Sequence, residues 1–207
     1  GAEIANVSIV GGETASLPEI IRGFDLAGTC IGMIKKKDVI TGERIEKGDV
    51  VIGLPSSGLH SNGFSLARKI VEESGYTYFD KMPYSKKTIG EELLEPTRIY
   101  MEALAVVQKA DVHGMAHITG SGLLKLHRIS GFGFEIDDPI EPQPIFRFLQ
   151  EEGGVAEDEM YRTFNMGMGW VFVLPEDDVD AVLGMTDGKV VGEITDSGLR
   201  LGDLELK

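Results

Sequence analysis

Residues 49–73 read DVVIGLPSSGLHSNGFSLARKIVEE, and this stretch decides the fold. The mainly apolar run 49–54 predicts a buried strand, and the apolar residues of 64–73 recur at helical spacing. The loop between them consists of small and polar residues: Ser56, Ser57, Gly58, His60, Ser61, Asn62 and Gly63. Because a helix N-terminus presents unpaired N–H groups and a partial positive charge, this junction is predicted to bind a phosphate or a carboxylate.

A purely structural loop is the alternative at this junction. Ser and Asn cap helices, and Gly serves tight turns. The loop lacks the Gly-Lys-Ser/Thr of a P-loop and the acidic residue that a dinucleotide-binding fingerprint places on a ribose. On the residues alone we place anion binding slightly ahead of capping, since an imidazole such as that of His60 is costly to bury unpaired and useful beside an anion.

The composition is that of a soluble globular protein. The 207 residues are 42% hydrophobic and 26% charged, which suffices for a core without disulfides. The net charge of −14 repels polyanions, so we expect no nucleic-acid binding, although local donors remain compatible with a small phosphorylated substrate. No apolar stretch reaches membrane-spanning length and no secretory signal is visible, so the expected location is the cytoplasm, with no membrane partner. Cys30, the only cysteine, excludes an internal disulfide and a cysteine-rich metal site, and its apolar surroundings predict a buried thiol.

A second junction, residues 111–122 (DVHGMAHITGSG), follows the same logic. A strand-like segment ends at His117, and a Gly/Ser/Thr turn leads into a short helix. Ligands of open α/β sheets collect where such turns meet at one sheet edge, so we expect His60 and His117 to face one ligand. His113 lies four residues before His117, but this segment is strand-like and lacks the Glu of a zinc helix, so no metal site is expected. For each histidine taken singly, an ordinary hydrogen-bonded imidazole is the alternative.

Arg162 and Asn165 form a third candidate, at a helix end before a glycine-punctuated strand. Arg162 either binds an anion or pairs with a nearby acid, and the second is commoner on surfaces. Met166 and Met168 are expected to pack rather than to react.

Strands and helices alternate with enough hairpin character to predict an α/β (α+β) fold on a mixed sheet with helices packed on it. The expected strands are 6–10, 27–34, 49–54, 112–118, 133–136 and 169–174, followed by a closing hairpin of 189–194 with 199–204. The expected helices are 64–73, 98–110, 142–152, 157–163 and 177–183, with a short one near Leu123, while 75–90 is expected to be irregular. A composition shift and a turn signal within 35–47 predict a boundary near residue 40.

Five segments, taken together, resemble one family, the phosphoribosylformylglycinamidine cyclo-ligases, also called aminoimidazole ribonucleotide synthetases. They are GGETASLP (11–18), SSGLHSNGFSLARKI (56–70), LLEPTRIY (93–100), DVHGMAHITGSG (111–122) and DEMYRTFNMGMG (158–169). They follow the order of the family and cover nearly the whole chain. Ser121 departs from the pattern, since the family commonly has a third glycine there.

The resemblance implies an enzyme of de novo purine biosynthesis that uses ATP and Mg²⁺. The family phosphorylates the formyl oxygen of formylglycinamidine ribonucleotide, and an internal nitrogen then closes the imidazole ring and expels phosphate, giving aminoimidazole ribonucleotide. The family's motifs assign phosphate positioning and proton transfer to His60 and His117, with the proton-transferring ring left open. They assign substrate or phosphate binding to Ser56, Ser57, Gly58, Ser61, Asn62, Thr119, Gly120, Arg162 and Asn165, and ATP binding to Gly11, Gly12, Glu13 and Thr14.

The family also has a longer N-terminal domain, which forms the homodimer and carries most nucleotide contacts and the metal-binding acids. We therefore interpret residues 1–40 as a remnant of that ATP-binding and dimerisation domain, with its terminal strands, and 41–207 as the C-terminal α/β domain. The chain alone is not expected to turn over. Two alternatives stay open: a detached ribonucleotide-phosphate-binding domain that needs a partner chain, and a paralogue that acts on another phosphorylated amide.

Overall fold

The computed structural model describes all residues, 1–207, as two units, Gly1–Val39 and Ile40–Lys207. The first unit contains turns and one 3-10 helix, η1 (Lys36–Asp38), and no strand. The strands expected at 6–10 and 27–34, as terminal strands of an N-terminal domain, are therefore wrong, and Cys30 is exposed rather than buried. A strand needs a neighbour that pairs with its N–H and C=O groups, and the 39 residues of this unit offer none.

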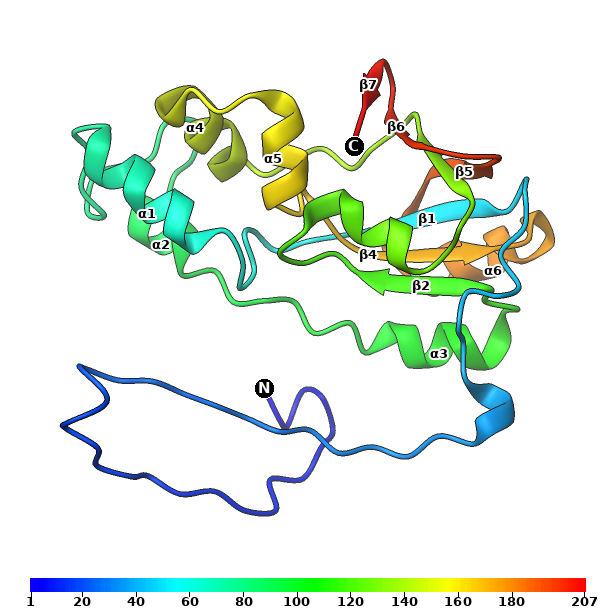
Figure 1. Ribbon diagram of the computed structural model, residues 1–207, viewed down its shortest axis with the longest axis horizontal. Helices are drawn as coiled ribbons and strands as arrows, with labels where there is room; N and C mark the ends of the chain where they lie inside the picture. Colours follow the sequence, from blue (N-terminus) through cyan, green and yellow to red (C-terminus); the bar gives the residue numbers. More distant parts are fainter. The chain divides into compact units, whose positions relative to one another are not determined.

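The second unit is built on one mixed sheet of seven strands (Figure 1). The strands are β1 (Val50–Pro55), β2 (Gly114–His117), β3 (Gly133–Ile136), β4 (Met168–Leu174), β5 (Lys189–Thr195), β6 (Leu199–Leu201) and β7 (Leu204–Glu205). Their spatial order is β2-β4-β1-β5-β3-β6-β7, and every pair is antiparallel except β3 with β6. The predicted fold class, an α/β fold on a mixed sheet, is confirmed.

Helices cover both faces of this sheet. They are α1 (Phe64–Glu73), α2 (Ile89–Leu93), α3 (Glu102–Lys109), α4 (Pro144–Gly153), α5 (Glu157–Thr163) and α6 (Val179–Leu183), with 3-10 helices η2 (Gly122–Arg128) and η3 (Glu176–Asp178). One core contains α1, α4, α5 and η2, and the other contains α3 and α6; Figure 1 shows α3 alongside β2, with α4 and α5 on the other side. None of the helices combines the length and the apolar character that crossing a membrane requires.

Alternation of side chains along the central strands fills the two cores. Val51 of β1 and Val171 of β4 belong to the first core, whereas their neighbours Ile52 and Phe172 belong to the second. Because β1 lies between β4 and β5 and is covered on both faces, its sequence is a continuous apolar run rather than an alternating one.

Three expectations about individual elements need correction. The closing hairpin is wrong: β6 pairs with β3 and β7, because the apolar strand β3 inserts between β5 and β6. Helix α3 begins at Glu102 rather than at residue 98, because Arg98 and Tyr100 are drawn into other contacts described below. Helix α2 was not predicted, although its start carries a capping box between Thr88 and Glu91.

Candidate functional site

The two predicted junctions meet at one edge of the sheet. Strands β1 and β2 both run antiparallel to β4, which lies between them, so their carboxyl ends point the same way. The first turn (residues 56–63) follows β1, and the second turn (residues 118–122) follows β2. The rings of His60 and His117 lie 5.9 Å apart between centroids, and a Cβ built on Gly120 would lie 2.7 Å from Asn62 Oδ1. The expected convergence of the two turns is therefore observed.

Internal hydrogen bonds hold the first turn. The Asn165 amide, 3% exposed, donates from Nδ2 to the carbonyl of Gly58 (2.8 Å) and accepts from the N–H of Gly167 (3.0 Å). The N–H of Ser56 donates to the Gly167 carbonyl (2.8 Å), and the Ser56 carbonyl accepts from Gln143 Nε2 (2.6 Å). The Ser57 hydroxyl donates to the carbonyl of Pro96 (2.6 Å). These side chains fix the shape of the turn, whereas those of Ser61 and Asn62 remain exposed or half-buried.

His60 occupies an unusual position in this turn. Its φ of 62° lies in the left-handed region, which is uncommon for a residue other than glycine, and it is only 5% exposed. The N–H of Ser57 donates to its Nε2 (3.1 Å), so the neutral ring carries its proton on Nδ1. That Nδ1 is buried without a partner. Burial, and then the charges of His117 and Arg98, lower the pKa of His60 from 6.5 to about 4, so the ring is a neutral hydrogen-bond donor at pH 7.

Aromatic side chains surround the two imidazoles. The ring of Tyr100 lies 6.2 Å from that of His60, 5.8 Å from that of His117 and 5.5 Å from that of Trp170, between centroids. Trp170 stacks on His117 at 5.9 Å and 27°. His117 Nε2 and Trp170 Nε1 are also buried without partners. Burial, followed by the charge of Lys125, lowers the pKa of His117, so two neutral imidazoles face each other.

Arg98 and Tyr100 anchor the end of β1. Arg98 Nη1 (3.1 Å) and the Tyr100 hydroxyl (3.0 Å) both donate to the carbonyl of Pro55, the last residue of that strand. The Arg98 guanidinium also pairs with Asp187 and Glu102 and lies 4.9 Å from the centre of the Tyr100 ring. The residues assigned from the sequence include neither Arg98 nor Tyr100 nor Trp170, although the quoted segment 93–100 contains the first two.

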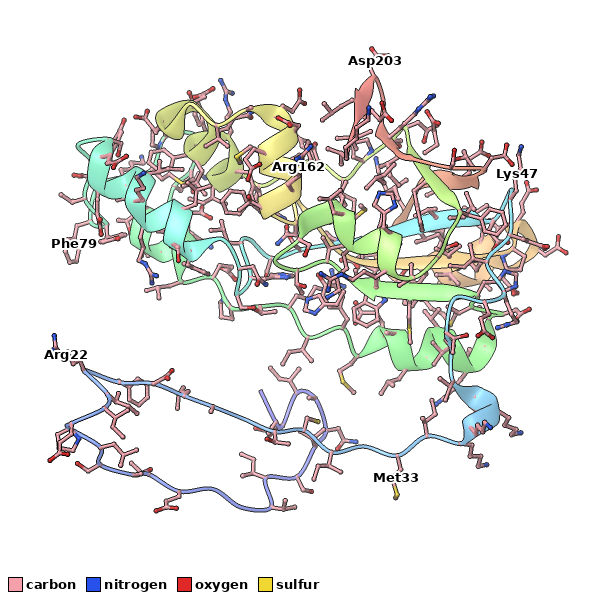
Figure 2. All side chains as sticks on the ribbon, viewed as in Figure 1. Arg22, Met33, Lys47, Phe79, Arg162 and Asp203 are labelled. Atoms are coloured by element: carbon pink, nitrogen blue, oxygen red, sulfur yellow. The ribbon has the colours of Figure 1, made fainter.

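Three cations lie around the second turn. Lys125 Nζ donates to the Thr119 hydroxyl (3.1 Å), and Arg128 donates to the Ser121 hydroxyl (3.4 Å). Gly122, with φ of 50°, lets the turn approach α5 closely, because a Cβ there would lie 1.9 Å from the Tyr161 carbonyl oxygen. Arg162 of α5 (Figure 2) is 3.7 Å from Asp158 and has a buried Nε without a partner. In a chain of net charge −14, this local positive charge suits an anion, and only Arg162 of the three was predicted.

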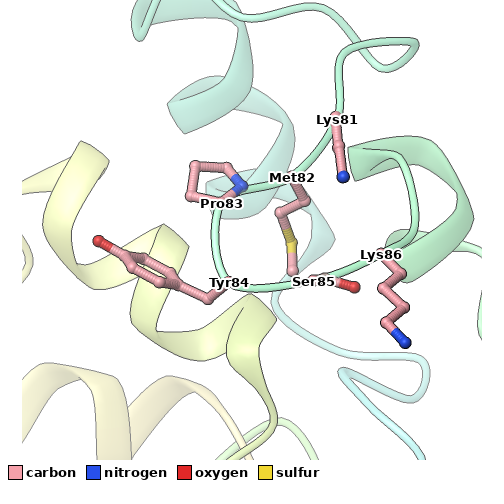
Figure 3. Close-up of a pocket in the computed structure, with 6 residues that line it drawn as sticks. All are labelled: Lys81, Met82, Pro83, Tyr84, Ser85 and Lys86. Atoms are coloured by element: carbon pink, nitrogen blue, oxygen red, sulfur yellow. The ribbon is translucent and has the colours of Figure 1, made fainter.

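Two cavities of the second unit lie away from the pair of histidines. A cavity of about 530 Å³ is the inside of the loop from Lys81 to Lys86, whose side chains spread in several directions (Figure 3). A mainly apolar cavity of about 580 Å³ lies between α1 and α2 and is bordered by the exposed Phe79. No group of three or more His, Cys, Asp or Glu side chains is placed to hold a metal ion. Gly11, Gly12, Glu13 and Thr14 belong to the unit 1–39 and are exposed.

The family model and the related sequences that match this chain all point to one family. The family described as "AIR synthase related protein, C-terminal domain" matches residues 46–202. Relatives named phosphoribosylformylglycinamidine cyclo-ligase include those of Methanococcoides burtonii, 62% identical over all of this chain, and Methanothermobacter thermautotrophicus, 50% identical over 96% of it. The chain spans 62% and 60% of the length of these two relatives.

Solved structures share the fold. The hydrogenase maturation protein HypE in complex with ATP superposes with a TM-score of 0.54 at 17% identity, over 80% of this chain and 48% of that one. Thiamine-monophosphate kinase from Stenotrophomonas maltophilia gives a TM-score of 0.54 at 16% identity, over 81% of this chain and 54% of that one. Such identities carry information about architecture alone.

Proposed function

Because this chain belongs to the AIR synthase related family through the C-terminal domain at residues 46–202, we propose that it forms the larger part of a phosphoribosylformylglycinamidine cyclo-ligase. The relatives with that name, identical at 62% and 50% of positions, support the proposal. The structural observation that carries it is the meeting of two turns, which places two neutral imidazoles beside three cations.

The proposed reaction makes two demands on the protein. The formyl oxygen of formylglycinamidine ribonucleotide receives a phosphoryl group from ATP, an internal nitrogen attacks the activated carbon, and phosphate leaves as the imidazole ring closes. Negative charge on the phosphoryl oxygens must be held by fixed donors, and the attacking nitrogen must lose a proton.

The two histidines suit these demands differently. His60 Nε2 already accepts the N–H of Ser57, so His60 offers only the Nδ1 proton and acts as a donor to an anionic oxygen. His117 Nε2 has no partner, and its lowered pKa keeps the ring neutral, so we assign it to accept the proton from the attacking nitrogen. Because both nitrogens are buried, ligand binding in this proposal includes a small rotation of the rings.

The second turn suits the phosphate of the ribonucleotide. We assign that group to Thr119, Gly120, Lys125 and Arg162, with Ser61 and Asn62 of the first turn on the other side. Ser56, Ser57 and Asn165, which have internal partners, and Gly58, whose carbonyl Asn165 binds, hold the turn in shape.

The proposal extends to the whole enzyme. ATP contacts at residues 11–14, a homodimer and a cytoplasmic location are parts of it. Mg²⁺ belongs to the proposal as the ion that accompanies ATP; because these residues form no group of three or more His, Cys, Asp or Glu side chains, we assign no metal ligand among them and derive no step from the ion.

Thermal-shift titration of the 207-residue chain tests the proposal. Formylglycinamidine ribonucleotide alone should raise the melting temperature, since these turns bind the substrate without ATP. Stabilisation only in the presence of ATP would favour a paralogue, and stabilisation by neither would overturn the proposal. The purified chain should not carry out ATP-dependent ring closure. Detection of aminoimidazole ribonucleotide would disprove the proposal that this chain is only a part of the enzyme.

A further inference from the structure

Tyr100 contacts the other three ring systems at the meeting point of the two turns. Its ring lies within 6.2 Å of those of His60, His117 and Trp170, between centroids, and it is 9% exposed. His117 is the other ring of the cluster with all three neighbours, so Tyr100 is the ring besides the two histidines that reaches both imidazoles. A shift of this ring would therefore change both imidazoles together.

The hydroxyl of Tyr100 is fixed to the backbone that starts the first turn. It donates to the carbonyl of Pro55 (3.0 Å), and the next residue, Ser56, begins the turn. Burial raises the pKa of the Tyr100 phenol far above its usual value, so the hydroxyl keeps its proton and remains a donor. The same carbonyl accepts from Arg98, whose guanidinium lies over the Tyr100 ring, so ring, turn and strand form one unit.

Strand β4 leaves room for the Tyr100 hydroxyl and the His60 ring at Gly169. A Cβ built on Gly169 would lie 1.9 Å from the Tyr100 hydroxyl oxygen and 2.8 Å from His60 Cε1. Only glycine leaves room for both groups at this point of the chain. On its other side, Tyr100 precedes α3, and Ala103 and Val106 of that helix share its core, so the ring has a rigid support.

We propose that Tyr100 is a positioning residue that sets the separation of His60 and His117 and fixes the first turn on β1. It acts through these two rings and has no contact with reacting atoms. Its importance for catalysis rests on the proposed function above, whereas its effect on the histidines does not. Simple packing is the competing explanation, and it predicts a loss of stability without a change at the imidazoles of a folded variant.

Two variants of the 207-residue chain separate these explanations. Tyr100→Leu removes the ring, and Tyr100→Phe keeps the ring but removes the hydrogen bond to Pro55. Tyr76→Phe is the matched control, because Tyr76 also packs edge-on against an aromatic ring, that of Phe148, at 5.4 Å, and forms no hydrogen bond through its hydroxyl. The readouts are NMR titration of the four histidines, emission of the only tryptophan, and hydrogen exchange of the Ser57 amide.

In Tyr100→Leu the titration midpoint of His60 should rise by about one unit toward 6.5, and Trp170 emission should change, because both rings lose their neighbour. In Tyr100→Phe the midpoints should stay in place, while the Ser57 amide should exchange roughly 3- to 10-fold faster, as expected for the loss of one hydrogen bond. Tyr76→Phe should alter none of these. If Tyr100→Leu does not fold, the exchange rate in Tyr100→Phe decides the matter. Unchanged exchange in Tyr100→Phe, or an unchanged His60 midpoint in a folded Tyr100→Leu, would overturn the proposal.

The affinity for formylglycinamidine ribonucleotide, measured on the same variants, separates this inference from the proposed function. We expect affinity to fall roughly 3- to 10-fold in Tyr100→Phe and further in Tyr100→Leu. If the unsubstituted protein binds no ribonucleotide while the Tyr100 variants still change the histidine titration or the Ser57 exchange rate, that result would support the positioning role of Tyr100 and reject the proposed function.

Discussion

The imidazole rings of His60 and His117 lie 5.9 Å apart, although they follow two strands that never pair with each other. Strand β4 separates β1 from β2 and runs antiparallel to both, which brings their carboxyl ends to one edge. A ligand that spans the two turns therefore meets both rings. The predictions below test the rings, the turns and the cations around them.

His60→Asn should keep the fold and lose ligand binding. Asparagine tolerates the left-handed backbone of residue 60, so the free energy of unfolding should fall by only about 1 kcal/mol, whereas His60→Ala should lose roughly 1 kcal/mol more through backbone strain. Stabilisation by formylglycinamidine ribonucleotide should be abolished in both variants. His127→Asn, at an exposed position on η2, is the control and should bind normally. An unfolded His60→Asn would instead favour a purely structural histidine.

Stability should fall between pH 6.5 and about 4 because of His60. The unfolded chain has the ordinary pKa of 6.5 and the folded chain a pKa of about 4, so below pH 6.5 the unfolded chain binds a proton that the folded chain does not. The free energy of unfolding should decrease as the pH falls through this window, by at most roughly 3 kcal/mol, and His60 should have no effect above it. Urea unfolding of the protein and of His60→Asn across this range isolates the contribution. Parallel curves would contradict the prediction.

Gly169→Ala should destabilise the protein by about 1–3 kcal/mol and disturb the site, because the new methyl group would collide with the Tyr100 hydroxyl and His60 Cε1. Denaturant unfolding measures the first effect, and the histidine NMR signals report the second. Gly131→Ala is the control, because a Cβ at residue 131 meets no atom within 4 Å. Equal behaviour of the two variants would show that the approach at Gly169 is not tight.

Asn165→Asp should be costly although it changes few atoms. The carboxylate would face the carbonyl of Gly58 without a proton to donate, in a side chain that is 3% exposed. We expect a loss of about 2–3 kcal/mol in the free energy of unfolding. Asn62→Asp, at a half-buried position whose only side-chain hydrogen bond is a long one to Ser61, should change stability by only about 0.5 kcal/mol. Chemical denaturation compares them, and similar losses would reject the role of Asn165 in holding the turn.

Lys125→Ala should weaken the affinity for formylglycinamidine ribonucleotide roughly 3- to 10-fold, because it removes one of the cations beside the second turn. The loss should shrink as the salt concentration rises. Lys86→Ala removes an exposed charge from the loop at residues 81–86 and should leave affinity unchanged. Isothermal titration at two salt concentrations measures both, and equal effects would indicate a general charge effect rather than a site.

Local patterns in the sequence were enough for most of the elements. The apolar run of β1, the helical spacing of α1 and the glycine-rich turns each depend on neighbouring residues, so they were predictable. The same patterns were misleading at residues 27–34, which are apolar but have no strand to pair with. The order of the strands in the sheet could not be predicted from local patterns either, because β3 pairs with β5 and β6 through contacts between residues that are distant along the chain.

The sequence by itself determined the mixed α/β class, the family resemblance and the two turns that carry His60 and His117, because these follow from local composition and motif. The sequence also predicted that the two turns meet, and the tertiary structure confirmed it. Only the tertiary structure decided that the N–H of Ser57 makes His60 a donor and that Arg98 and Tyr100 share the carbonyl of Pro55. The physical reason is that burial and hydrogen-bond partners depend on which distant segments pack together, and these set the tautomer and the pKa of each imidazole.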